Sequence, residues 1–262
     1  MQKEMKFLAL RIDDIGASSK AFEVYSNKLR GCANFLFLKS LPFLKNWGPY
    51  RELSVTEWDA ILRIIRENGI NLTVAITAVW VEEDGKLVPF PDKFPQQASL
   101  LKEASRAGLC EIANHGLTHC LEGKHMPRLF TSNRKFHREF YPERAESEVK
   151  EHLRLSQDIL QNYFQQKIVT LVPPGSVWSE VTERLCPEFG LKIISCGGIG
   201  ETRNQNGVFL LGEKDTIAFH DRDLVLKGIG FLSSLIKEYL NTELISVKEA
   251  VNRIRCSKKY LG

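Results

Sequence analysis

The chain has 262 residues, of which 43% are hydrophobic and 26% are charged. This is an ordinary globular composition, sufficient for one large core or two modest ones. The formal charge of +4 is too small to indicate a nucleic-acid partner, and no stretch approaches the roughly 20 apolar residues of a membrane helix. The apolar run near the N-terminus is shorter than a signal-peptide core of about 7–15 residues. We therefore expect a cytoplasmic protein without a transmembrane segment, in which the six cysteines are buried thiols.

Strand-like and helix-like segments alternate along the chain. In chain order we expect a strand at 7–12, a helix at 54–67, a strand at 71–77, a helix at 96–107, a strand at 110–114, a helix at 143–164, a strand at 168–172, a helix at 179–189, strands at 192–195 and 216–220, and helices at 223–239 and 246–254. The first helix has a plausible N-cap at Ser54 or Thr56 and ends before Gly69. Strands that alternate with helices of this length favour a parallel α/β structure, and near this chain length a barrel.

Reactive side chains follow three of the expected strands. Asp13 and Asp14 come after the first strand, His115 and His119 after the strand at 110–114, and His220 ends the strand at 216–220. The carboxyl ends of strands are where active sites form in α/β proteins. Two imidazoles and one carboxylate make a three-ligand metal site that can activate a water. The i,i+4 spacing of the histidines, on one helical turn, places both rings on one side.

Each of these groups also has a plainer structural interpretation. Asp13-Asp14 is typical of a turn, and one HxxxH pattern arises easily by coincidence in a chain with six histidines. A single histidine such as His220 is often a hydrogen-bonded core residue. Adjacent residues at a strand end point in different directions. One of the two aspartates can therefore bind a metal while the other acts as a general base on a bound water.

The segment Pro173-Pro174-Gly175 ends the strand at 168–172 in a stiff turn. Gly175 permits a backbone amide to approach a ligand closely and stabilise an oxyanion, although an ordinary strand-ending turn has the same sequence. Trp178 is either a platform on which a sugar ring stacks or a core aromatic.

Residues 116–141 interrupt the alternation of strands and helices. The segment is long, poorly periodic and rich in histidine, arginine and aromatic residues. Long insertions in compact domains are usually functional or disordered, and we expect an active-site loop. Its basic side chains either contact a nucleotide-sugar or lipid-pyrophosphate group or form a solvated face. They are Lys124, Arg128, Arg134, Lys135, Arg138 and, just beyond, Arg144.

The order Asp-Asp, HxxxH, Pro-Pro-Gly and His-Asp, each after an apolar strand, resembles the polysaccharide deacetylase family, also called the NodB-homology or carbohydrate esterase family 4 group. The resemblance runs from Asp13 to His220. It implies a distorted (β/α) barrel that forms a single domain over residues 1–262. It also implies one divalent metal ion, usually zinc, and hydrolysis of an N-acetyl group from an amino sugar.

The resemblance assigns roles to particular residues. It implies Asp13 as the catalytic base and His220 as the catalytic acid. The implied metal ligands are Asp14, His115 and His119. The backbone amide offered to the oxyanion falls at Gly175, and the other residues expected at the substrate are Pro174, Trp178 and Arg138.

The chain departs from the family pattern at three places. Gly116 stands where the family often has serine or threonine, and Val172 stands where it has the arginine that orients the base. The family's aspartate-tryptophan motif, which supports the acid histidine, has no clear counterpart, so Asp215 or Asp221 is expected to substitute. These departures indicate a divergent branch of the surface-polysaccharide or O-antigen type. Its substrate is then an acetamido sugar that is free, nucleotide-linked or lipid-linked.

Two other functions stay open at this stage. Two histidines and one carboxylate also describe non-haem iron oxygenases, although those usually have all-β scaffolds. Loss of the family arginine also suits a non-catalytic carbohydrate-binding relative. Nucleic-acid binding is disfavoured by the small charge and the absence of a known module. The sequence determines neither the acyl group, acetyl or formyl, nor the oligomeric state.

Overall fold

The computed structural model describes residues 6–22, 51–82, 84–121 and 137–257. Part of the expected active-site loop lies outside these ranges, together with Lys124, Arg128, Arg134 and Lys135. The strands are β1 (Phe7–Ile15), β2 (Leu72–Ile76), β3 (Val79–Val81), β4 (Leu87–Pro89), β5 (Cys110–Asn114), β6 (Thr170–Leu171), β7 (Ile193–Ser195), β8 (Arg203–Gln205), β9 (Val208–Leu211), β10 (Thr216–His220) and β11 (Glu243–Ile245).

The α-helices are α2 (Val55–Glu67), α3 (Phe90–Lys93), α4 (Pro95–Arg106), α5 (Glu146–Phe164), α6 (Glu180–Leu185), α7 (Asp221–Lys227), α8 (Gly230–Glu238) and α9 (Val247–Cys256). Short 3₁₀ segments are η1 (Ser18–Phe22), η5 (Pro174–Ser176), η6 (Cys186–Phe189) and η7 (Glu213–Asp215). None of the helices in the described ranges combines the length and the apolar composition that a membrane span requires.

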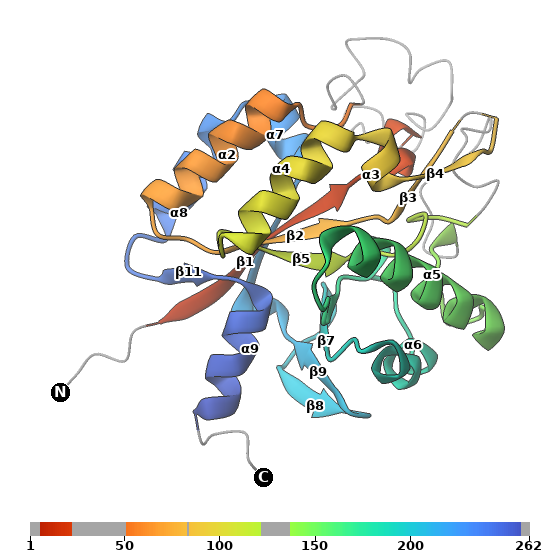
Figure 1. Cartoon of the computed structure of the whole chain (residues 1–262). Coiled ribbons are helices and arrows are strands. Elements are labelled where there is room, and N and C mark those ends of the chain that lie inside the picture. The colour runs from red at the N-terminus through yellow and green to blue at the C-terminus, as the bar shows by residue number, and fades with distance from the viewer. Residues whose placement is uncertain (1–5, 23–50, 83, 122–136, 258–262) are drawn as a thin grey trace, which may run out of the picture.

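A single nine-stranded sheet forms the centre of the molecule (Figure 1). Its strand order is β10-β1-β2-β5-β6-β7-β9-β8, and β11 pairs with β1 beside β10. All pairs in it are parallel except β8 with β9. No pairing joins β10 to β8 among the described strands, so the barrel is not closed. The expected α/β class with a distorted barrel is confirmed, whereas the assignment of the whole chain to one domain stays a prediction.

Alternation along β1 separates the outer and inner faces of the sheet. Leu10 and Ile12 belong to the largest apolar cluster, in which α2, α4 and α8 pack on the outside of the sheet. Ala9 lies on the other face, against the apolar side of α9. Because successive side chains point to opposite faces, Arg11 and Asp13 continue the inner face beyond Ala9. The interior therefore changes from apolar near α9 to charged at the carboxyl end of β1.

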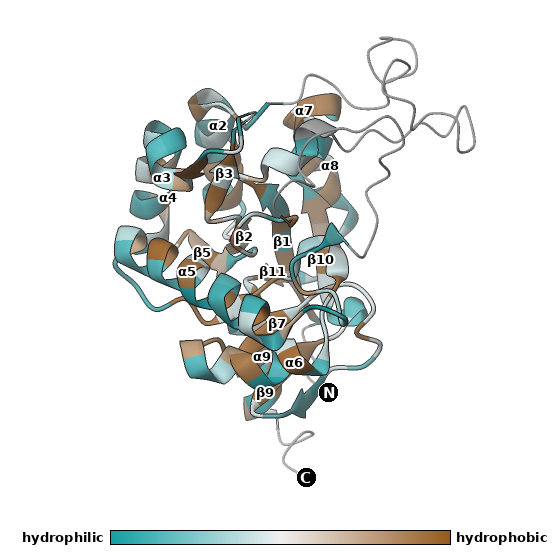
Figure 2. Cartoon of the chain, turned by 90° about the vertical axis from the view of Figure 1, so that its right-hand side faces the viewer, coloured by the Kyte–Doolittle hydropathy of each residue, from teal (hydrophilic) through white to brown (hydrophobic). Residues whose placement is uncertain are grey.

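Helix α9 closes the amino-terminal end of the interior. Its buried residues pack on the first residue of β7 and on β9. The backbone amide of Val247 donates to Thr73 Oγ1, and the amide of Lys248 donates to Glu111 Oε2. These bonds satisfy amides of the first helical turn that lack a partner within the helix. The surrounding helices carry both hydrophilic and hydrophobic residues (Figure 2), as expected for helices with one side on a core.

Several expected boundaries are confirmed and others are wrong. The strands at 110–114 and 216–220 match β5 and β10, and Ser54 caps α2 with its side chain. The expected helix at 223–239 is instead two helices, α7 and α8, because Gly228 between them has a left-handed φ of 76°. The first strand continues to Ile15 and so contains Asp13 and Asp14. The short strands β3, β4, β8, β9 and β11 were not expected.

Candidate metal centre and active site

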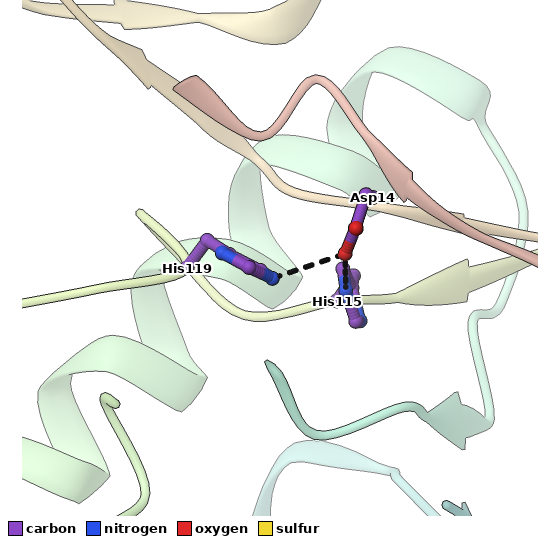
Figure 3. A group of neighbouring side chains, drawn as sticks. All are labelled: Asp14, His115 and His119. Carbon is purple, nitrogen blue, oxygen red and sulfur yellow. Dashed lines mark hydrogen bonds and ion pairs between the residues drawn. The ribbon is translucent and has the colours of Figure 1, made fainter. Parts of the chain in front are cut away.

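Three expected metal ligands come together at the carboxyl ends of β1 and β5. Asp14, His115 and His119 are buried, and each offers one ligand atom within 4.8 Å of the others. Nε2 of His115 and Nε2 of His119 each lie 3.2 Å from Oδ1 of Asp14 (Figure 3). Two imidazole nitrogens and one carboxylate oxygen are the donor set of a catalytic zinc site. These residues therefore fit a divalent metal.

A bulge in β1 directs Asp14 toward the histidines. Asp14 has a left-handed φ of 70°, and the pairing of β1 with β2 shifts register between Ile12 and Ile15. In a regular strand, neighbouring side chains would point to opposite faces. The bulge re-aims the side chain. Lys20 stabilises the bulged backbone: its Nζ donates to the Asp14 carbonyl oxygen at 3.0 Å and to Glu52 Oε2 at 2.6 Å.

The histidine pair lies on an irregular loop rather than on the expected helical turn. Positive φ angles at Gly116 (81°) and His119 (68°) fold this loop so that both rings face Asp14. Glu139 holds the loop from the other side: its carboxylate accepts the backbone amides of Leu117 at 2.8 Å and Thr118 at 2.7 Å.

Gly116 is required by the same packing. A Cβ built on it would lie 2.9 Å from Glu139 Oε1 and 3.0 Å from Pro174 Cγ. Such contacts are too short for a larger residue. The departure from serine or threonine at this position therefore accompanies Glu139, a residue that the sequence interpretation did not identify.

The second nitrogen of each ring has a partner. His115 Nδ1 lies 2.6 Å from the carbonyl oxygen of Val172, which only accepts, so Nδ1 carries the hydrogen and Nε2 keeps its lone pair. His119 Nδ1 lies 2.5 Å from Ser19 Oγ and 2.7 Å from Nη1 of Arg138, and because a guanidinium only donates, Nδ1 of His119 accepts. Burial, followed by the guanidinium of Arg138, lowers the pKa of His119 well below its ordinary value. His119 is thereby held neutral, which is the form that binds a metal.

Asp14 is held ionised by the charges around it. Burial alone would raise the pKa of Asp14, but the charge of His220 and the contacts with His115 and His119 outweigh burial and hold this pKa well below its ordinary value. Nη1 of Arg222 lies 3.2 Å from Asp14 Oδ2, on the oxygen that the histidines do not contact. An ionised carboxylate in this position is ready to bind a cation.

The expected base and acid are neighbours across two strands. Asp13 on β1 and His220 on β10 are paired in register. Burial lowers the pKa of His220, but Asp14, Asp223 and Asp13 together raise it to about 9. The imidazole therefore carries a proton at neutral pH, as a general acid must.

The aspartate that supports His220 is neither of the two expected residues. Asp223 Oδ2 lies 3.9 Å from His220 Nδ1 and accepts the His220 backbone amide at 3.0 Å. Asp215 accepts a hydrogen bond from Thr202, and Asp221 forms an ion pair with Lys20. The expectation that Asp215 or Asp221 substitutes is therefore wrong. The i,i+3 spacing at the start of α7 was a sequence signal for the correct residue.

The remaining expected substrate residues are distributed unevenly. Pro174 packs over Gly116, and Gly175 is exposed with a φ of 61°. A Cβ on Gly175 would lie 2.7 Å from Nε of Arg138, so this buried guanidinium lies directly against the Gly175 turn. Trp178 packs against the apolar cluster around α5, α6 and β7, and no described contact brings it to the metal ligands. Its sugar-stacking role, like the oxyanion role of Gly175, stays a prediction.

Sequence comparison identifies the family. The sequence model of the family described as polysaccharide deacetylase matches residues 48–194, more than half of the chain. The chain belongs to the polysaccharide deacetylase family. The matched segment contains His115, His119 and Pro174, whereas Asp13 and His220 of this family member lie outside it. No curated protein matches its sequence.

Solved structures resemble this deacetylase-family chain in fold. A protein assigned to the polysaccharide deacetylases from Mycobacterium smegmatis is 13% identical, with a TM-score of 0.56, and the match covers 97% of this chain and 91% of the other. A family 4 pseudoenzyme from Bacillus anthracis (13% identity, TM-score 0.46) is matched over 74% of this chain and 60% of its own length. A family 4 acetyl xylan esterase from Clostridium thermocellum in complex with a cobalt ion (9% identity, TM-score 0.44) is matched over 77% and 87%. At 13% identity, the first comparison supports a shared fold and leaves the substrate undetermined.

Proposed function

We propose that this protein is a metal-dependent hydrolase that removes the acetyl group from an acetamido sugar. The observation that carries the proposal is the convergence of the three ligands Asp14, His115 and His119. Beside them, Asp13 on β1 and His220 on β10 are paired in register. A three-ligand metal site flanked by a carboxylate and a protonated imidazole suits hydrolysis of an amide. The parallel α/β sheet and the family membership disfavour the iron oxygenase alternative.

A divalent ion, for which zinc is the best fit, would polarise the amide carbonyl and lower the pKa of the attacking water. Asp13 accepts the proton of that water as the carbon–oxygen bond forms. His220 donates its proton to the departing nitrogen, so that a free amine leaves when the carbon–nitrogen bond breaks. The Gly175 amide is assigned to the developing oxyanion, with Arg138 behind the turn. The products are acetate and the amino sugar.

The substrate is proposed to be a precursor of a surface polysaccharide of the O-antigen type, handled in the cytoplasm. The support is the departure of this chain from the ordinary family pattern at Gly116 and Val172, and the basic side chains that the sequence carries between 124 and 144. Of these, Arg138 is buried against the Gly175 turn, and Arg144 forms an ion pair with Glu148 at 2.5 Å. Lys124, Arg128, Arg134 and Lys135 lie outside the described residues, and their contact with a nucleotide or lipid pyrophosphate stays a prediction from the sequence.

The test is acetate release by the zinc-loaded protein. The probes are N-acetylglucosamine, its uridine-diphosphate form and a chitin oligomer, assayed with wild type and with Asp13→Asn. We expect turnover of at least one probe by wild type and a loss of about 10²–10⁴-fold in kcat in the variant, the usual contribution of a general base, with zinc content unchanged. Full activity in Asp13→Asn would refute the assigned base. Absence of acetate from every acetamido sugar would refute the function.

A further inference from the structure

We infer that Arg11 is the residue that positions the base Asp13, from the same strand, and that Ser195 in turn holds Arg11. The inference rests on the proposed function for its kinetic consequence, but its geometric basis is independent of substrate. Arg11 was not among the residues expected at the site.

The contact between Arg11 and Asp13 is a two-point ion pair. Arg11 Nε lies 2.8 Å from Asp13 Oδ1, and Arg11 Nη2 lies 2.9 Å from Asp13 Oδ2. Two parallel N–H···O bonds define both the distance and the plane of the carboxylate, which a single contact cannot do. The Arg11 side chain is only 4% exposed and that of Asp13 only 8%, so solvent screens this pair weakly.

The third nitrogen of the guanidinium, Nη1, reaches across the interior of the open barrel. Arg11 Nη1 donates to the carbonyl oxygen of Ser195 at 2.6 Å and lies 2.8 Å from Ser195 Oγ. Ser195 ends β7, whereas Arg11 lies on β1, and three strands (β2, β5 and β6) lie between them in the order of the sheet. The guanidinium of Arg11 is therefore bonded on one side to the carboxylate that it orients and on the other side to β7, across the interior of the incompletely closed barrel.

This arrangement leaves Asp13 able to act as a base. A carboxylate offers about four lone-pair positions on its two oxygens, and Arg11 occupies one on each oxygen. The guanidinium is not deprotonated in proteins, so it cannot take the proton onward. Arg11 therefore sets where the Asp13 oxygens point, while the proton taken from water stays on Asp13 until it leaves toward solvent or product.

The arginine on β1 also accounts for the absence of an arginine beside Pro173. Val172 is buried in a small apolar cluster with Ala75 on β2 and Ala113 on β5. A chain with valine there and no other cation would leave the Asp13 carboxylate buried and unpaired, which is costly. Because Arg11 supplies the cation from a different strand, the valine does not mark this site as degenerate.

The experiment compares Arg11→Lys, Ser195→Ala and a matched control, Arg253→Lys. Lysine keeps the positive charge but cannot form the fork. Arg253 forms a similar two-point pair with Glu243, at 2.5 and 2.8 Å, between α9 and β11 at the other end of the molecule. We expect kcat to fall about 10- to 100-fold in Arg11→Lys and less in Ser195→Ala, the range found when a partner that orients a site residue is lost. KM and zinc content stay unchanged, and Arg253→Lys keeps wild-type kcat.

Crystal structures of zinc-loaded wild type and Arg11→Lys give a readout that does not depend on turnover. The Asp13 carboxylate is expected to rotate out of its wild-type plane while the three metal ligands keep their positions. An unmoved Asp13, or a kcat loss equal to that of Arg253→Lys, overturns the inference. If wild type releases acetate from no probe, the proposed function fails, and the orientation of Asp13 in the two crystal structures still decides the role of Arg11.

Discussion

Replacing Glu139 with glutamine tests whether a buried carboxylate shapes the loop that carries both metal histidines. Glu139 is fully buried, and its carboxylate accepts the amides of Leu117 and Thr118 at 2.8 and 2.7 Å. His152 Nδ1 lies 2.8 Å from the same group. The glutamine amide keeps one acceptor oxygen, but its NH₂ group then faces a backbone N–H, so one donor loses its partner.

The magnitude follows from these bonds. A hydrogen bond to a charged group contributes about 1.5–3 kcal/mol, and a neutral one about 0.5–1.5 kcal/mol. Losing one charged bond and weakening the other gives a decrease of about 2–4 kcal/mol in the free energy of unfolding. Most domains have about 5–15 kcal/mol in total, so the variant should fold. Because the loop then positions His119 less well, zinc affinity should fall about 10- to 100-fold.

The assay is urea unfolding of the metal-free protein together with zinc titration against a competing chelator. Glu188→Gln is the matched control, since Glu188 forms an exposed ion pair with Lys150 at 2.7 Å and should contribute less than about 1 kcal/mol. If Glu139→Gln behaves like Glu188→Gln in both measurements, the carboxylate does not shape the metal site and the reasoning is refuted.

Two further predictions concern charges behind the site. Asp223 helps to raise the pKa of His220 to about 9, and His220 must be protonated to donate, so activity is lost as pH rises through that pKa. Asp223→Asn should move the alkaline limb of the kcat–pH profile to lower pH. A metal cation bound beside His220 lowers the pKa of His220 further in both proteins. An unmoved alkaline limb counts against His220 as the acid. Lys20→Met leaves Asp221 and Glu52 buried without their cation and should cost about 3–5 kcal/mol in urea unfolding; a cost below about 1 kcal/mol would show that these carboxylates do not need Lys20.

Much of the site could be predicted because each reactive group directly follows or ends an apolar strand. Parallel strands bring their carboxyl ends to one edge of the sheet, and Asp13, His115 and His220 are found there. The alternating pattern likewise predicted β5 and β10 with correct bounds. These are features that depend on local periodicity and on the topology it implies.

Other features depend on contacts between distant residues and could not be predicted in this way. The left-handed conformation of Asp14 is stabilised through Lys20 and Glu52, and Glu139 binds a loop about 20 residues earlier. Arg11 is different, because its i,i+2 spacing from Asp13 on a strand places both side chains on one face. That spacing was visible in the sequence, and only the bond to β7 required the structure.

The most direct test of the account is whether acetate release depends on metal at this site. Wild type and His115→Ala are stripped with a chelator, reloaded with zinc, and assayed for bound metal and for acetate release from acetamido sugars. The account predicts that stripped wild type is inactive and recovers with one zinc ion per chain, while His115→Ala neither binds zinc at that stoichiometry nor recovers. Undiminished acetate release by metal-free wild type, or no stoichiometric binding of zinc, cobalt or iron, would contradict it.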